Sequence, residues 1–209
     1  MISSVVSMTA IGPDLPGFSA TARWLGPVPR WTPLGEHGVE MIAPARSDRF
    51  HDPAVDTRQA DSPLWAVEAE APSNLVARVT VDFTDTFDAG VLMAYQSRDA
   101  WAKLCFERDP AGRVMVVSVV TRGRSDDANA FLVDGSTVWL RVSLLPRATA
   151  FHASTDGRHW EFVRYFRLGT RGRPRLGLSA QAPVGDGCAV RFEHVRLSPG
   201  AVDDLRGGA

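Results

Sequence analysis

The stretch WAKLCFE, residues 101–107, decides the fold together with the turn Asp109-Pro110-Ala111-Gly112 and the apolar run VMVVSVV that follows at residues 114–120. Side chains alternate between the two faces of a strand. Read with this period, WAKLCFE has an apolar side of Ala102, Leu104 and Phe106, and an opposite side of Trp101, Lys103, Cys105 and Glu107. Pro presets φ for a turn and Gly closes it. The stretch therefore predicts a β-hairpin with one dry face and one mixed face.

A helical alternative exists for the same residues. Trp101, Leu104, Cys105 and Arg108 also fit an i, i+3, i+4 pattern. The flanking turn residues and the β-branched run after them favour a strand.

Similar strands separated by turn residues continue from Asn74 to the end of the chain. The sequence predicts them at Leu75–Phe83, Gly90–Gln96, Trp101–Glu107, Arg113–Thr121, Val138–Leu145, Ala148–Ser154, Trp160–Phe166, Leu176–Gln181 and Ala189–Leu197, with shorter ones at Val39–Ile42 and Leu64–Glu70. The pair Asp156-Gly157 is a strong hairpin signal. This spacing is typical of an antiparallel sandwich or barrel. We expect an N-terminal tail or arm over residues 1–22, rich in Gly, Pro, Ser and Thr, and one domain over residues 23–206.

Composition excludes several functional classes. A net charge of −1 argues against a nucleic-acid partner, which would favour a basic patch. No apolar run reaches the roughly 20 residues that span a bilayer, and the first residues lack the basic region of a signal peptide. Two cysteines are too few for a disulfide framework. We therefore expect a cytoplasmic protein without a membrane or nucleic-acid partner.

The mixed faces supply the candidate site. With residues 109–112 as the loop, Glu107 lies opposite Val114 and Trp101 opposite Val120, and the same side continues to Arg122. The hairpin at Pro146-Arg147 places Trp139 and Arg141 beside His152. Flat indoles among polar groups suit sugar rings. The predicted ligand-binding residues are Gln96, Trp101, Lys103, Glu107, Arg122, Asp126, Trp139, Arg141, His152 and Gln181. The alternative is that the tryptophans are buried beneath the long N-terminal region.

Several blocks of the sequence resemble a known family. W-x-K-x-x-x-E at residues 101–107, VVTRGRSDD at 119–127 and SAQAPVGDG at 179–187 are similar to the domain-of-unknown-function family that includes the yeast regulator of enolase. This family belongs to the concanavalin A-like lectin/glucanase superfamily. The resemblance covers roughly residues 24–206 and implies an all-β jelly-roll sandwich of two curved antiparallel sheets. It also implies that certain residues occupy motif positions of the family: Trp101, Lys103, Glu107, Thr121, Arg122, Ser125, Asp126, Gln181 and Asp186.

Catalytic and metal motifs are weak. Glycosidases need two carboxyls about 5–5.5 Å apart for retention or about 6.5–9.5 Å apart for inversion, and the E-x-D-x-x-E block of related glucanases does not occur in this sequence. The five histidines show no H-x-H or HExxH spacing. We expect no metal and no cofactor. The single motif S154-T-D-G-R-H-W160 resembles an Asp-box hairpin and is interpreted as a structural turn.

These observations favour a non-catalytic domain that binds a carbohydrate or a sugar-like small molecule on its concave face, with a regulatory role in carbohydrate metabolism. Two alternatives stay open. One is a glycoside hydrolase or lyase that uses Glu107. The other is a protein-interaction module that contacts a metabolic enzyme.

Overall fold

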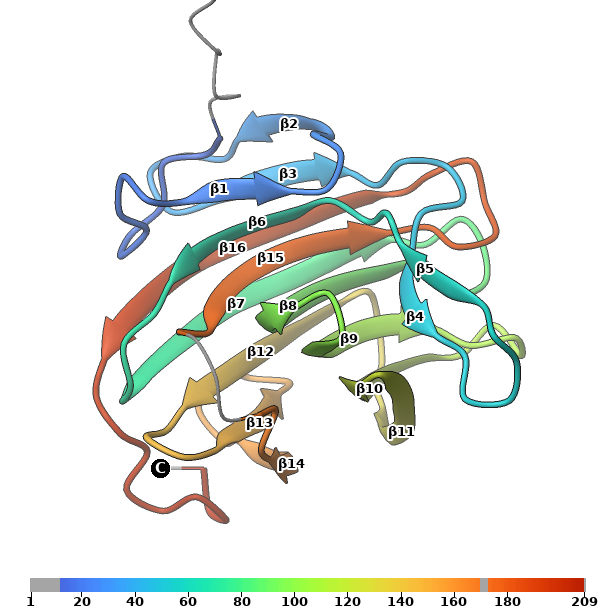
Figure 1. Ribbon diagram of the computed structural model, residues 1–209. Helices are drawn as coiled ribbons and strands as arrows, with labels where there is room; N and C mark the ends of the chain where they lie inside the picture. The colour runs from blue at the N-terminus through green and yellow to red at the C-terminus, as the bar shows by residue number, and fades with distance from the viewer. Residues whose placement is uncertain (1–11, 170–172, 209) are drawn as a thin grey trace, which may run out of the picture.

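The computed structural model describes residues 12–169 and 173–208 and contains two large antiparallel sheets (Figure 1). The first sheet has seven strands in the order β1 (Arg23–Leu25), β6 (Leu64–Glu68), β15 (Arg175–Gln181), β8 (Ala89–Ser97), β9 (Ala100–Arg108), β10 (Val114–Arg122) and β11 (Arg124–Leu132). The second has the order β14 (Glu161–Phe166), β13 (Thr149–Ser154), β12 (Thr137–Leu144), β7 (Ser73–Asp82), β16 (Ala189–Pro199), β3 (Val39–Ile42) and β2 (Arg30–Pro33). The expected jelly-roll sandwich is confirmed.

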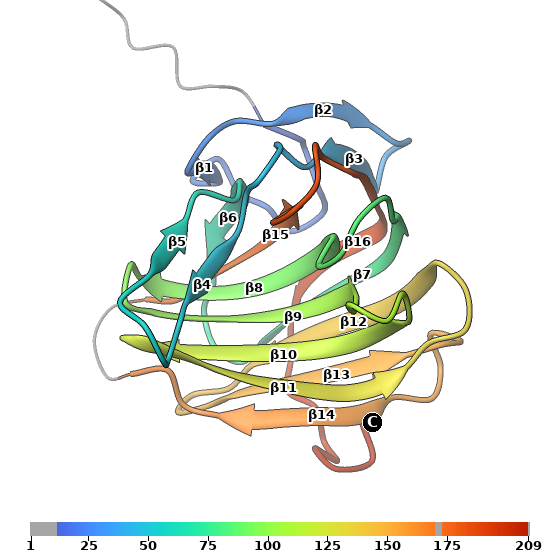
Figure 2. The same cartoon turned by 90° about the vertical axis from the view of Figure 1, so that its right-hand side faces the viewer.

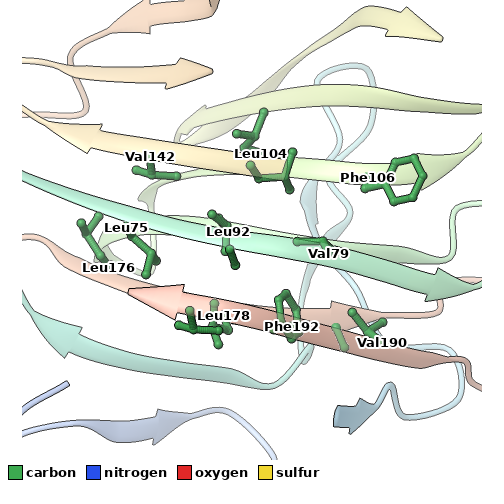
Figure 3. Close-up of a cluster of buried hydrophobic side chains, with 14 of the residues drawn as sticks. Leu75, Val79, Leu92, Leu104, Phe106, Val142, Leu176, Leu178, Val190 and Phe192 are labelled. Atoms are coloured by element: carbon green, nitrogen blue, oxygen red, sulfur yellow. The ribbon is translucent and has the colours of Figure 1, made fainter. Parts of the chain in front are cut away.

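The main core lies between the two sheets (Figure 3). Leu92, Leu104 and Phe106 enter it from the first sheet, and Val142 and Phe192 enter it from the second; all five are fully buried. Because side chains alternate along a strand, each sheet gives one face to this core. No helix within the described residues is long and apolar enough to cross a membrane.

A second apolar layer covers the outer face of the first sheet. It contains Met93, Trp101, Cys105 and Val117, which point away from the main core. The small sheet of β4 (Arg49–His51) and β5 (Arg58–Ala60) crosses this face in front of β8, β9 and β10 (Figure 2). Strands buried on both faces lose the apolar–polar alternation, which explains the continuous run VMVVSVV.

The β9–β10 hairpin differs from its predicted register by one residue. Glu107 pairs with Met115, and Trp101 pairs with Thr121. The cause is Gly112, which adopts φ 80° and donates its N–H to Asp109 O at 2.9 Å. Asp109 then pairs with Arg113, since its N–H donates to Arg113 O at 2.8 Å. A three-residue loop with a glycine bulge therefore replaces the expected four-residue loop.

The other hairpin predictions are confirmed. In β12–β13, Leu140 pairs with Ala153 and Arg141 pairs with His152. The strand β11 was missed because its sequence RSDDANAFL lies at the sheet edge and is mostly exposed, and charged edge strands lack the apolar period. Residues 1–11 of the expected N-terminal arm lie outside the described residues. Within the rest of the arm, Leu15 is buried in the core.

Candidate functional site

A pocket of about 150 Å³ opens on the outer face of the first sheet beside β4. We call it the Glu107 pocket. Its lining combines three carboxyl groups, one ammonium, one amide and two aromatic rings, contributed by Asp48, Phe50, Phe87, Lys103, Glu107, Val119, Asp127, Gln181 and Pro183. Three of the predicted ligand-binding residues, namely Lys103, Glu107 and Gln181, meet here because β9 and β15 present them on the same face of the sheet.

Lys103 is the structural centre of the pocket. Its side chain is buried, and its Nζ lies 3.0 Å from Asp48 Oδ1 and donates to Gln181 Oε1 at 3.0 Å. The amide nitrogen of Gln181 in turn donates to Phe87 O at 3.4 Å. Burial alone would lower the pKa of Lys103, but the negative charge of Asp48 raises it above its usual value. The ammonium therefore stays charged and holds Gln181 and Asp48 in place.

Glu107 carries a proton near neutral pH. Burial is the main cause that raises its pKa to about 8, and the nearby Asp127 and Asp48 add to this effect while Lys103 opposes it. Burial raises the pKa of Asp127 as well. A protonated carboxyl donates a hydrogen bond, whereas an ionised one only accepts. The pocket can therefore offer both a hydrogen-bond donor and a hydrogen-bond acceptor to a hydroxylated ligand.

Phe87 lies at the pocket mouth in a strained backbone conformation. Its φ is 66°, and its side chain is 38% exposed. The turn is held by Asp88, whose Oδ2 accepts the N–H groups of Thr84 and Asp85, each at 2.8 Å. A bulky residue at positive φ is uncommon and is often found at a functional site. Strained backbone is not visible in a sequence, so the sequence did not single out Phe87.

Asp127 lines the Glu107 pocket, whereas the predicted ligand-binding residue Asp126 does not. In the observed register Val119 pairs with both Lys103 and Asp127, so these three share the outer face. Asp126 belongs to the other face, where its carboxylate accepts from Arg164 at 2.8 Å. Recognising β11 and its register would have been needed to choose Asp127.

Trp101 is fully buried and presents no surface to a ligand. Its ring packs edge-on against His51 of β4 at a centroid distance of 5.7 Å. The backbone of His51 is fixed by its N–H, which donates to Ser125 Oγ at 2.9 Å. The alternative interpretation therefore holds for Trp101, because a segment from the N-terminal part of the chain covers it.

Trp139, Arg141 and His152 lie on the second sheet, and they face away from the main core. The chain segment near residue 205 covers Arg141 and His152: Arg141 Nη2 donates to Gly208 O at 2.6 Å, and His152 Nε2 lies 2.8 Å from Leu205 O. Trp139 instead stacks on His194 at a centroid distance of 5.3 Å. The expectation that these residues share one groove with Trp101 is therefore wrong. The hairpin pattern identified their common face correctly, but it carries no information about which sheet they join.

The two remaining predicted residues also lie elsewhere. Arg122 points off the end of β10, and its Nη1 donates to Arg167 O at 3.0 Å. Its place follows from the one-residue register difference, which moves it to the other face of the sheet from Trp101. Gln96 lines a separate cavity of about 310 Å³ with Leu144 and Arg167.

The predicted Asp-box turn is structural. Asp156 Oδ1 accepts the N–H groups of Arg158 and His159, each at 2.8 Å. Across the described part of the chain, no group of three or more His, Cys, Asp or Glu side chains is placed to hold a metal ion.

Solved structures show where this architecture occurs. A functionally unknown protein from Saccharomyces cerevisiae matches with a TM-score of 0.78 at 22% identity, over 85% of this chain and 96% of that one. The carbohydrate-binding module CBM66 from Bacillus subtilis matches with a TM-score of 0.55 at 14% identity, over 89% and 99%. The GH43 protein BlXynB from Bacillus licheniformis matches with a TM-score of 0.64 at 14% identity, over 80% of this chain but only 34% of that one. At these identities the likeness shows the fold.

Sequence comparison identifies the family. No curated protein matches this chain. The family model described as "Protein of unknown function (DUF1349)" matches residues 24–200, which includes fifteen of the sixteen strands in full and the last two residues of β1. The chain therefore belongs to the DUF1349 family of proteins of unknown function.

Proposed function

We propose that this protein is a non-catalytic carbohydrate-binding domain that holds an uncharged sugar in the Glu107 pocket. One observation carries the proposal: a single small pocket combines exposed Phe87 with buried Lys103, Gln181 and the carboxyls of Glu107 and Asp127. An apolar ring face with a few convergent polar groups is the usual composition of a small-molecule site. The likeness of the fold to a carbohydrate-binding module supports the same class of ligand.

The charge and the size of the pocket define the ligand. Its carboxylates outnumber its one ammonium, so a phosphorylated or acidic sugar would meet repulsion. Drug-sized ligands occupy roughly 300–1,000 Å³, and this pocket of about 150 Å³ suits one sugar ring or the end of a glycan. Asp127 can accept from hydroxyl groups, and protonated Glu107 can donate to one.

Titration calorimetry with neutral mono- and oligosaccharides tests the proposal. Asp127→Asn keeps the shape of the side chain and removes its charged acceptor, so affinity should fall about tenfold, the value of one charge-assisted hydrogen bond. Asp134→Asn is the matched control, because Asp134 is exposed in the loop before β12. If no neutral sugar binds at about 10 mM, equivalent to a binding free energy of about −2.7 kcal/mol, or if both variants weaken binding equally, the proposal is wrong.

We also propose that the protein works in the cytoplasm and reports sugar levels to a metabolic enzyme. The observation that supports a protein partner is apolar surface beside the pocket, where Phe87 is 38% exposed and Val184, next to the lining residue Pro183, is 51% exposed. Exposed apolar patches mark interaction sites. An enzyme that co-purifies only in the presence of the sugar, and is lost in Val184→Asp, would support this role, and a sugar-independent partner would contradict it.

Glycoside hydrolysis is the second candidate, because Glu107 combines a pKa of about 8 with two further carboxyls in the same pocket. A protonated carboxyl can act as the general acid, and an ionised one as base or nucleophile. Release of nitrophenol from a panel of aryl glycosides, lost in Glu107→Gln, would establish this activity. Binding of sugars without turnover of any glycoside would exclude it.

A further inference from the structure

A second cavity lies on the opposite outer face of the molecule, above β12 and β16. We call it the Arg141 cavity. It measures about 290 Å³ and is bounded by residues of the segment that follows β16, which runs beside β13 and β14 in Figure 1. Its lining consists of Asn74, Val76, Trp139, Arg141, Gly157, Trp160, Arg196, Ser198, Ala201 and Val202. Nothing in the Glu107 pocket contributes to it, since that pocket lies on the other sheet.

The cavity is positively charged. Arg141 and Arg196 both line it, and none of its described lining residues carries a carboxylate. Arg141 is only 9% exposed, and its one hydrogen bond to the described residues is the contact with Gly208 O at 2.6 Å. Its Nε is buried without a partner. Among the described residues this buried cation has no counter-charge. An unpaired buried cation is costly, so an anion bound here would be stabilising.

Other arginines of the same sheet are paired differently. Arg78 Nη1 lies 2.7 Å from Glu193 Oε2, and Arg191 donates to both carboxylate oxygens of Asp82 at 2.7 and 2.9 Å. Neither Arg141 nor Arg196 has such a carboxylate among the described residues. A register shift in β16 lies between Glu193 and Arg196, and Arg196 lines the cavity; bulges often occur beside functional sites.

Aromatic and polar groups complete the walls. The guanidinium carbon of Arg141 lies 4.4 Å from the ring centroid of Trp160. Trp139 packs against Gly157, where a Cβ would approach its ring to 2.8 Å, and it stacks on the ring of His194 at a centroid distance of 5.3 Å. Asn74 donates to Gly200 O at 2.9 Å, while its Oδ1 is buried without a partner. Flat indoles beside an unused acceptor suit a hydroxylated ring.

We propose that the Arg141 cavity binds a sugar ring that bears an acidic group, a carboxylate as in a hexuronate or a phosphate as in a sugar phosphate. Arg141 and Arg196 hold the acidic group, the two indoles contact the ring, and Asn74 Oδ1 accepts a hydroxyl. Guanidinium groups match carboxylate and phosphate oxygens in geometry as well as charge.

The test follows the indole N–H signals of Trp139 and Trp160 by nuclear magnetic resonance while glucuronate, glucose 6-phosphate or glucose is added. Either acidic sugar should shift both signals, with weaker binding at high salt, and glucose should bind about tenfold more weakly or not at all. The tighter of the two acidic sugars identifies the acidic group. The proposal is overturned if neither acidic sugar shifts these signals, or if glucose binds equally well.

Arg196→Gln is the decisive variant, because Arg196 is exposed and its loss should leave the fold intact. We expect affinity for the acidic sugar to fall about tenfold, one charge-assisted contact. Arg30→Gln removes the same charge from the exposed edge strand β2 of the same sheet and should leave affinity unchanged. If both variants lose the same affinity for the acidic sugar, the effect of Arg196 is a long-range charge effect only, and the assignment of the Arg141 cavity as the binding site is overturned.

Discussion

The backbone of Phe87 is strained, and the free energy of this strain can be measured by substitution. At φ 66° a side chain other than glycine costs roughly 1–2 kcal/mol. Phe87→Gly and Phe87→Ala both remove the ring, but only glycine relieves the backbone. We expect Phe87→Gly to be about 1 kcal/mol more stable than Phe87→Ala in urea denaturation. Equal stability of the two variants would show that the turn relaxes to another conformation.

Glu107 makes stability depend on pH with a sign opposite to that of most carboxyls. Its folded pKa of about 8 lies above its ordinary value of 4.5, so the folded protein holds a proton that the unfolded chain has released. The stability from this proton is fully present below about pH 4.5 and is lost as pH rises through about 8, by at most about 1.4 kcal/mol per pH unit.

Urea denaturation between pH 5 and pH 8 isolates this effect when the protein is compared with Glu107→Gln, which cannot ionise. The variant should gain stability relative to the unmodified protein as pH rises. Parallel pH profiles would mean that Glu107 has an ordinary pKa, and the general-acid role would then lose its support.

Lys103 and Asp48 form a buried ion pair whose side chains are 4% and 14% exposed. Lys103→Met leaves Asp48 without its cation and Gln181 Oε1 without its donor. Breaking such a pair from one side typically costs about 3–5 kcal/mol. The free energy of unfolding should fall by this amount, and a double-mutant cycle with Asp48→Asn should show coupling of the two side chains. If the two substitutions lower the free energy of unfolding additively, the side chains are not coupled and this prediction is wrong.

The β9–β10 hairpin shows how one residue decides which side chains meet. The alternation of WAKLCFE predicted the two faces of β9, but the partner face of β10 depends on the loop, and a loop with a bulge looks the same in sequence as one without. The predicted register placed Arg122 on the same face as Trp101 and paired Lys103 with Ser118, whereas Lys103 pairs with Val119 and Arg122 lies on the other face. Register is set by turn geometry, which the sequence Asp109-Pro110-Ala111-Gly112 leaves open.

Gly112 is the test of this bulge. A Cβ at this position would meet only the Arg108 side chain, at 3.6 Å or beyond, so the cost of a substitution is confined to the backbone at φ 80°. We expect Gly112→Ala to destabilise by about 1–2 kcal/mol and Gly112→Asn by less, because Asn tolerates positive φ. If Ala and Asn are tolerated equally, the hairpin does not need its left-handed residue.

The whole molecule contains information that no single hairpin carries. Period-two patterns predicted eleven strands, the dry face of β9 and the dry face of the β12–β13 hairpin, because burial on one side leaves a local signature. They could not show that β12 and β13 belong to one sheet and β9 to the other, since sheet membership depends on contacts between distant segments. The candidate site was accordingly predicted as one groove, whereas the structure separates an acidic pocket and a basic cavity by the thickness of the sandwich.

The shared core predicts that both outer faces unfold together. Phe192 of β16 is fully buried in the main core, which joins the two sheets. Phe192→Ala should cost about 3–5 kcal/mol, with Phe192→Leu costing less because it leaves a smaller cavity. With 5-fluorotryptophan as probe, the signals of Trp101 on one face and Trp160 on the other should lose their native shifts at the same urea concentration in each protein. Separate midpoints would mean that the two sheets are independently stable, and ligand binding at one face could then leave the other unaffected.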